Sequence, residues 1–176
     1  MEITIREPNL EIMTKEGIPK CFADIRDYFN EALETNSLPW IPRKTIITND
    51  EIKNLWIPSL KTNITLHAEL NSRVVGSGTV FYDTKSTGYE HTGQRVPGNF
   101  GFTADPKYYF LTFRKMMPFL VEKLKKQNKT AIFTSAIESP AIKIMENLGY
   151  KGKLLENQDR YKQAGLSGKI MEYHLP

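Results

Sequence analysis

Residues 101–150 read GFTADPKYYFLTFRKMMPFLVEKLKKQNKTAIFTSAIESPAIKIMENLGY, and their pattern decides the expected fold. The extended run 99–104 should end near Asp105, because a residue before proline is pushed toward extended geometry. From Phe113 to Leu124, apolar residues recur at helical spacing, with basic residues on the other face. Residues 130–134 (TAIFT) are typical of a buried strand. A strand, a crossover helix and a second strand predict a right-handed parallel unit.

The end of this stretch predicts a short helix. Ser139-Pro140 starts it, and residues 148–150 (LGY) end it, because proline is favoured in the first turn and glycine just after the last. We therefore predict Gly101–Ala104 as a central strand. The strand at 130–134 should lie beside it, with the two running parallel and diverging at their C-terminal ends.

Two segments of this stretch resemble the acyl-CoA core of the GNAT-type N-acetyltransferase superfamily. They are residues 104–109 (ADPKYY) with the following helix, and residues 139–150 (SPAIKIMENLGY). The second matches the family closely: a proline, Ala-Ile, a basic residue and, after a short helix, a Leu-Gly-aromatic ending. The resemblance implies one α/β domain over residues 1–176, with a mixed, largely antiparallel sheet of about seven strands and helices on both faces.

The remaining segments fit that architecture. Residues 2–7 alternate as a first strand, and 18–33 carry a helical apolar face. Residues 64–70 and 74–82 predict an antiparallel hairpin, which is similar to the second and third strands of the family. Two further alternating runs, 151–156 and 169–175, predict closing antiparallel strands.

Two connections carry additional expectations. Thr48 should begin a helix whose Ile52, Leu55 and Trp56 face inward. Residues 83–98 are polar and glycine-rich and predict a long loop, in which Glu90 and His91 are candidate proton acceptors or plain solvated groups.

Composition excludes several classes of protein. A chain of 176 residues with 40% apolar content fits one globular unit, and no apolar run reaches membrane-spanning length, so we expect a cytoplasmic protein without a membrane partner. One cysteine and three scattered histidines give no metal-ligand spacing, so no metal is expected.

The charge points toward an anionic ligand. The net charge is +4, the pI is about 9.0, and lysines concentrate between residues 114 and 129. This basic helix is a solvated face or lies near a site for a phosphorylated cofactor. It lacks the interleaved aromatics of single-strand binders, so nucleic acid is not the expected partner.

The resemblance implies acetyl-CoA as cosubstrate and assigns its binding residues. They lie at the end of the central strand, where a bulge eased by Gly101 is expected near 102–104, and at the start of the following helix: Phe102, Thr103, Ala104, Tyr109, Phe110, Leu111, Thr112, Phe113 and Arg114. In the family, a basic or amide residue is followed by two variable residues, glycine, one variable residue, and glycine or alanine. Here Tyr109, Thr112 and Arg114 occupy the three specified positions.

These substitutions leave two alternatives. In the first, backbone N–H groups still bind the pyrophosphate, Thr112 caps the helix through its hydroxyl, and Arg114 or Lys115 supplies charge. In the second, Phe110, Leu111 and Phe113 fill the site, and the fold remains without CoA binding. Pro118 adds the expectation that the helix kinks or begins late.

The family's catalytic groups map incompletely. The tyrosine often used as general acid falls on Met145, which leaves Tyr109 as a candidate proton donor. The position just before the second motif is Glu138, a candidate base or contact for a cationic acceptor, or simply an acid favoured by the helix dipole.

The leading functional hypothesis is direct transfer of an acetyl group from acetyl-CoA to a primary amine on a small molecule or peptide. The alternative is a non-catalytic domain of the same fold that binds an acyl-CoA, a small ligand or a protein partner. Assembly as a homodimer stays open.

Overall fold

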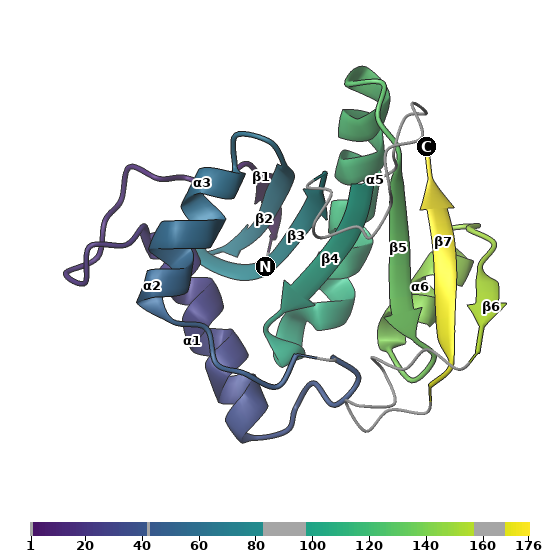
Figure 1. The fold of residues 1–176 in the computed structure, drawn as a ribbon, viewed down its shortest axis with the longest axis horizontal. Helices are drawn as coiled ribbons and strands as arrows, with labels where there is room; N and C mark the ends of the chain where they lie inside the picture. The colour runs from purple at the N-terminus through teal and green to yellow at the C-terminus, as the bar shows by residue number, and fades with distance from the viewer. Residues whose placement is uncertain (1, 42, 83–97, 157–167) are drawn as a thin grey trace.

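The computed structural model describes residues 2–41, 43–82, 98–156 and 168–176. Within these ranges the chain forms one seven-stranded sheet in the order β1-β2-β3-β4-β5-β7-β6 (Figure 1). Its strands are β1 (Thr4–Arg6), β2 (Ile64–Leu70), β3 (Arg73–Phe81), β4 (Gly98–Ala104), β5 (Ala131–Ala136), β6 (Lys153–Leu155) and β7 (Ile170–Leu175). Glu90 and His91 lie outside the described ranges.

The sheet is antiparallel except for one central pair, as predicted. β4 and β5 run parallel, and their pairing extends only from Gly98 opposite Ala131 to Phe100 opposite Phe133. Beyond Phe100 the strands separate toward their C-terminal ends (Figure 1). The predicted divergence is therefore confirmed, and residues 101–104 form its open part rather than the paired part.

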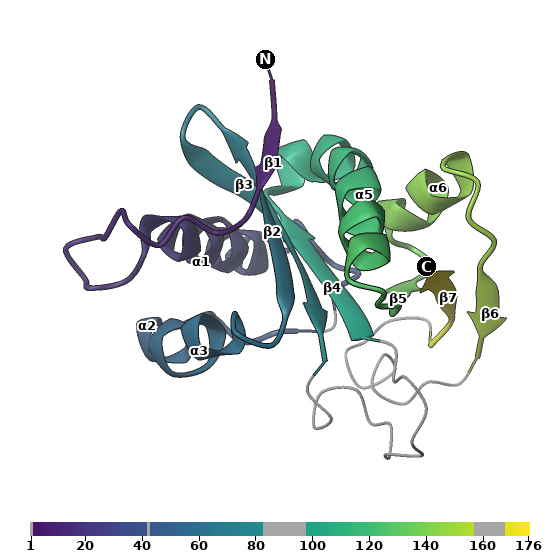
Figure 2. The same ribbon diagram turned by 90° about the horizontal axis from the view of Figure 1, so that it is seen from above.

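Helices cover both faces of the sheet (Figure 2). One face carries α5 (Tyr109–Lys126) and α6 (Pro140–Asn147), and the other carries α1 (Lys20–Glu34), α2 (Asn49–Glu51) and α3 (Ile57–Ser59). Because amphipathic helices bury one stripe each, both faces of the sheet become core. The predicted single-domain α/β architecture is confirmed in these ranges.

Glycines on β3 bring α5 close to the sheet. A Cβ atom added at Gly76 would lie 3.1 Å from the Cβ of Thr112, and one added at Gly78 would lie 2.5 Å from the sulfur of Met116. Thr112 and Met116 are one helical turn apart, so α5 packs along a strip of β3 that has no side chains.

The start of α5 differs from the sequence prediction. The helix begins at Tyr109, one turn before Phe113, after a 3₁₀ turn over Pro106–Tyr108. It also continues through Pro118, whose ring is exposed. The helix tolerates this proline because the buried stripe of α5 on either side of it supplies the packing energy. The residues expected in a binding loop therefore lie in the first two turns of a helix.

The segment after Thr48 also differs in one respect. Thr48 caps α2 as expected, with its hydroxyl accepting from the Glu51 N–H, but residues Ile52–Trp56 form a π-helical turn. The wider turn changes which side chains face inward, so Ile52 is buried, whereas Leu55 is 64% exposed. The prediction that Leu55 faces inward was wrong.

His67 lies fully buried in the middle of β2. Its ring packs edge-on against Phe22 at 5.5 Å between centroids, and neither ring nitrogen has a hydrogen-bond partner among the described residues. Burial lowers its pKa from 6.5 to about 3, because the charged imidazolium would lose its hydration. The folded protein therefore keeps this histidine neutral.

This burial predicts a specific acid sensitivity. Between pH 6.5 and pH 3 the unfolded chain binds a proton at His67 and the folded chain does not, so stability falls as the pH falls through this window. At pH 5 the loss should be about 2 kcal/mol, from about 1.36 kcal/mol for each pH unit. His67→Leu should abolish this part of the loss in urea unfolding at pH 7 and pH 5. His174→Leu, at an exposed histidine, should keep it, and equal pH dependence in wild type and His67→Leu would contradict the prediction.

Candidate functional site

The separation of β4 and β5 opens a cleft in the middle of the sheet. A cavity of about 190 Å³ lies there, lined by residues of both strands together with Trp40, Ile41 and Tyr109. Residues 101–104 pair with β3 on one side only, so alternate N–H and C=O groups on their other side meet no strand. A ligand in the cleft can satisfy these groups as a neighbouring strand would.

The open edge does not depend on a bulge in β4. Over residues 98–104, all described, β4 keeps one register with β3, from Asn99 opposite Phe81 to Ala104 opposite Gly76. The register shift in this part of the sheet lies instead between β2 and β3, where Ala68 is opposite Gly76 and Glu69 is opposite Val74. The expected bulge near 102–104 was wrong, because divergence from β5 already frees the backbone groups that a bulge would have freed.

The six residues at the start of α5 point in different directions. Phe110 and Leu111 are 46% and 37% exposed, and Arg114 is also exposed. α5 begins directly after the 3₁₀ turn Pro106–Tyr108, and the side chain of Tyr108, the residue before the helix, makes no capping hydrogen bond. The dipole makes this accessible end of the helix favourable for an anion.

The other residues of this turn face the core. The hydroxyl of Thr112 donates back to the carbonyls of Tyr108 and Tyr109, at 2.7 and 3.0 Å, so the prediction that it caps the helix was wrong. Phe113 is completely buried and its ring lies 4.8 Å from that of Phe102. Neither side chain occupies the exposed side of the first turn.

Tyr109 reaches the C-terminal end of β5. Its hydroxyl lies 3.5 Å from the Ser139 hydroxyl, and its ring packs edge-on against Trp40 at 5.5 Å. Ser139 caps α6 by accepting from the Ala141 N–H. Burial raises the pKa of Tyr109 above its ordinary value of 10.0, so its hydroxyl stays protonated at neutral pH. The structure thus places Tyr109, the candidate proton donor, in the wall of the cleft.

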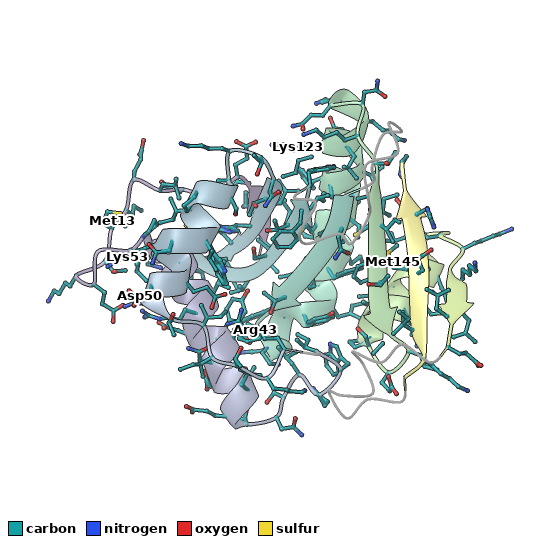
Figure 3. All side chains as sticks on the ribbon, in the orientation of Figure 1. Met13, Arg43, Asp50, Lys53, Lys123 and Met145 are labelled. Carbon is teal, nitrogen blue, oxygen red and sulfur yellow. The ribbon has the colours of Figure 1, made fainter. Side chains whose placement is uncertain are left out.

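The other candidates for proton transfer lie elsewhere. Glu138 is exposed in the turn between β5 and α6 and does not line the cleft. Met145 lies on α6, behind β5 and β7 in Figure 3, and is fully buried. Its thioether carries no proton, so Met145 cannot act as a general acid.

A second, larger cavity lies on the other side of β4, and sequence reasoning did not find it. It measures about 400 Å³ and is lined by residues of α1, by Ile41, by residues between 43 and 60 and by strands β2 to β4. Gly101, Phe102 and Ile41 line both cavities, so the two cavities adjoin where β4 leaves β5. Arg43, in the connection between α1 and α2, lies near this end of β4 (Figure 3).

A sequence signal for this cavity existed in the strands. Thr65, Ser77 and Thr79 place hydroxyl groups on one face of β2 and β3, where a fully buried sheet would carry apolar residues, and all three line the cavity. The hydroxyls of Thr65 and Thr79 lie 3.1 Å apart. The apolar wall residues come from distant segments, and no local pattern connects them.

Two further properties of the described ranges bear on function. No helix there has the length and apolar character needed to cross a membrane. No group of three or more His, Cys, Asp or Glu side chains that could hold a metal ion occurs there either.

Comparison with solved structures identifies the fold. A GNAT-family acetyltransferase from Streptococcus pneumoniae superposes with a TM-score of 0.68 at 15% identity, covering 98% of each chain. yncA from Salmonella typhimurium, solved with its cofactor acetyl-CoA, gives 0.67 at 15% identity over 98% of this chain and 92% of that one. Spermidine N-acetyltransferase from Vibrio cholerae, solved with CoA and spermine, gives 0.63 at 14% identity over 98% and 94%.

The chain therefore has the fold of the GNAT N-acetyltransferases, and the fold implied by the resemblance is confirmed. No protein-family model matches the sequence, and no curated protein matches it.

Proposed function

We propose that this protein transfers an acetyl group from acetyl-CoA to a primary amine by direct attack. The observation that carries the proposal is that two cavities share Gly101 and Phe102 as lining residues, on a strand whose backbone edge is open beyond Phe100. One cavity suits the cosubstrate and the other the acceptor, which is a small-molecule or peptide amine. Solved structures of this fold hold acetyl-CoA in one case and CoA with spermine in another, which supports the assignment.

The residues around the cleft fit an elongated, phosphorylated thioester. The open edge of Phe102–Ala104 offers alternate N–H and C=O groups to a chain lying in the cleft. The accessible first turn of α5, at Phe110 and Leu111, offers N–H groups to a pyrophosphate, with Arg114 exposed one turn further on. Acetyl-CoA, when bound, supplies the acetyl group as an activated thioester.

The three departures from the family pattern are compatible with this fit. Thr112 and Phe113 are buried, and the hydroxyl of Tyr109 points toward Ser139. The accessible face of the helix start is therefore formed by Phe110, Leu111 and Arg114. This favours the alternative in which backbone groups and a cation bind the pyrophosphate.

Direct transfer needs a polarised carbonyl, a neutral amine and a proton for the departing sulfur. An N–H of the open β4 edge polarises the carbonyl in our proposal, and the Tyr109 hydroxyl donates the proton. Glu138, which lines neither cavity, remains a predicted base or contact for the acceptor amine.

A non-catalytic binding domain is the second candidate. It is favoured by Met145, which occupies the position where the family often has a tyrosine that acts as general acid. It is also favoured by the exposed apolar side chains of Phe110 and Leu111, beside the proposed pyrophosphate site. In that case the cleft binds a ligand without transferring a group.

Ligand stabilisation and product formation test the proposal together. At a hundredfold excess over its dissociation constant, acetyl-CoA should raise the free energy of unfolding by about 2.7 kcal/mol. Mass spectrometry of a mixture of amines should then show an added acetyl group on at least one of them. Stabilisation without any acetylated product would favour the binding domain, and no stabilisation at millimolar acetyl-CoA would refute the acetyltransferase.

Arg114 tests the anion site. Arg114→Ala should weaken CoA binding by about 1.5 to 3 kcal/mol, the range for hydrogen bonds to charged groups. Lys125→Ala is the matched control, because it removes a cation from the last turn of the same helix and should leave affinity unchanged. Calorimetric titration measures both. Equal CoA affinity in wild type and Arg114→Ala would leave the backbone alone as the anchor.

Tyr109 tests proton donation. Tyr109→Phe should keep acetyl-CoA affinity, because the ring still packs on Trp40, and should lower kcat about a hundredfold, at the low end of general acid–base effects. Tyr108→Phe should change neither quantity. Because the Tyr109 pKa is raised above 10.0, this group should cause no alkaline loss of rate below pH 10. An unchanged kcat in Tyr109→Phe would remove it from the mechanism.

A further inference from the structure

The cavity beyond β4 has walls of one chemical character. Aromatic and branched aliphatic side chains line it, from the helical layer that contains α1 and from the strands: Phe22, Ile25, Phe29, Ile41, Trp56 and Phe102. Phe22 and Trp56 already pack edge-on at 5.7 Å, which is the arrangement that aromatic rings prefer. These walls are suited to a flat apolar group.

The charge in this wall is neutralised within the protein. Arg43 is the charged residue among the described residues that line the cavity, and its guanidinium binds Glu51 at 2.7 and 2.8 Å. It also donates to the carbonyls of Thr45 and Ile46, at 2.8 Å each. Glu51 in turn accepts from the Trp56 indole at 3.0 Å. This network fixes the wall and leaves no unpaired charge for a charged ligand.

The floor of the cavity offers uncharged polar groups. Thr65, Ser77 and Thr79 line it, and Thr103, on β4 next to the meeting point, has a buried hydroxyl with no partner among the described residues. A hydroxyl can accept from an amine N–H without favouring its charged form as a carboxylate would. No described aspartate or glutamate lines the cavity to bind a second ammonium group.

We propose that the acceptor is a primary amine joined through a short alkyl chain to an aromatic ring. This inference rests on the proposed function and names the substrate class of its second cavity. The ring lies among Phe22, Phe29 and Trp56, and the amine lies near Gly101 and Thr103. The amine nitrogen bonds to the acetyl carbonyl carbon, the carbon–sulfur bond breaks, and one amine proton is transferred, in net terms, to the departing sulfur.

Volume and desolvation both support this class. A cavity of about 400 Å³ is within the range of about 300–1,000 Å³ for small-molecule sites. A polyamine would bury an additional ammonium group without a carboxylate partner, and an unpaired buried charge is costly. An arylalkylamine buries apolar surface and a single reacting nitrogen.

The direct test compares two probe amines. With saturating acetyl-CoA, kcat/KM for 2-phenylethylamine should exceed that for spermidine by about tenfold or more, where tenfold corresponds to about 1.4 kcal/mol. CoA release, followed with a thiol reagent, measures both. A preference for spermidine would overturn the inference while leaving acetyl transfer intact.

A charge placed in the cavity wall provides the matched variants. Leu60 lines the cavity, whereas Leu55, on the neighbouring π-helical turn, is 64% exposed and does not. Leu60→Glu should lower kcat/KM for 2-phenylethylamine about tenfold and raise it for spermidine, and Leu55→Glu should change neither by more than about twofold. Retained stabilisation by acetyl-CoA shows that Leu60→Glu is folded. Equal effects of the two variants would overturn the inference.

Failure of the proposed acetyl transfer can be distinguished from failure of this ligand assignment. If no amine is acetylated, calorimetric titration of the wild type with 2-phenylethylamine, with and without CoA, still tests the cavity. Binding that Leu60→Glu removes and Leu55→Glu retains supports the ligand class. No binding to the wild type overturns it.

Discussion

Phe113 holds the separated strands apart, and the candidate site depends on that contact. Its ring lies 4.8 Å from Phe102 on β4 and 5.3 Å from Phe133 on β5, centroid to centroid. A side chain of this size, fully buried beneath the point of divergence, fills the space that a continuous strand pair would close. Aromatic packing against both strands therefore supports the gap beside the hydrogen-bonding groups of residues 101–104.

The same close packing explains why glycine is absent from the start of α5. A helix and a strand can approach closely if either partner lacks a side chain at the contact. Here Gly76 and Gly78 on β3 provide the space, and Thr112 and Met116 on α5 occupy it. The small residue lies on the strand, so its absence from the helix does not exclude a ligand at the helix start.

Local patterns predicted the sheet order around β4 and β5, the hairpin of β2 and β3, and α6. They failed where tertiary contacts override local preference. The proline at 118 suggested a late helix start, yet burial of the helix face extends α5 back to Tyr109. The π-helical turn rotates Leu55 away from the direction that an α-helix would give it. The second cavity combines residues between 22 and 103, and sequence periodicity gives no information over such a separation.

Of the candidate site residues, Tyr109 is placed in the cleft wall and Glu138 is not. Sequence position could not separate them, because both lie near the ends of neighbouring elements. The distinction depends on the direction of a side chain, which is set by packing against Trp40 and Ser139. Such contacts join segments about 30 to 70 residues apart and leave no trace in composition.

The edges of this sheet are short, which affects how the molecule behaves in a crowded solution. β1 and β6, the outermost strands, are three residues each and carry Arg6 and Lys153. Short, charged edges are poor templates for strands of other molecules. The unpaired backbone of residues 101–104 belongs to an inner strand, between β3 and β5, and not to an outer edge of the sheet. The fold thus combines an open strand edge with protection against aggregation.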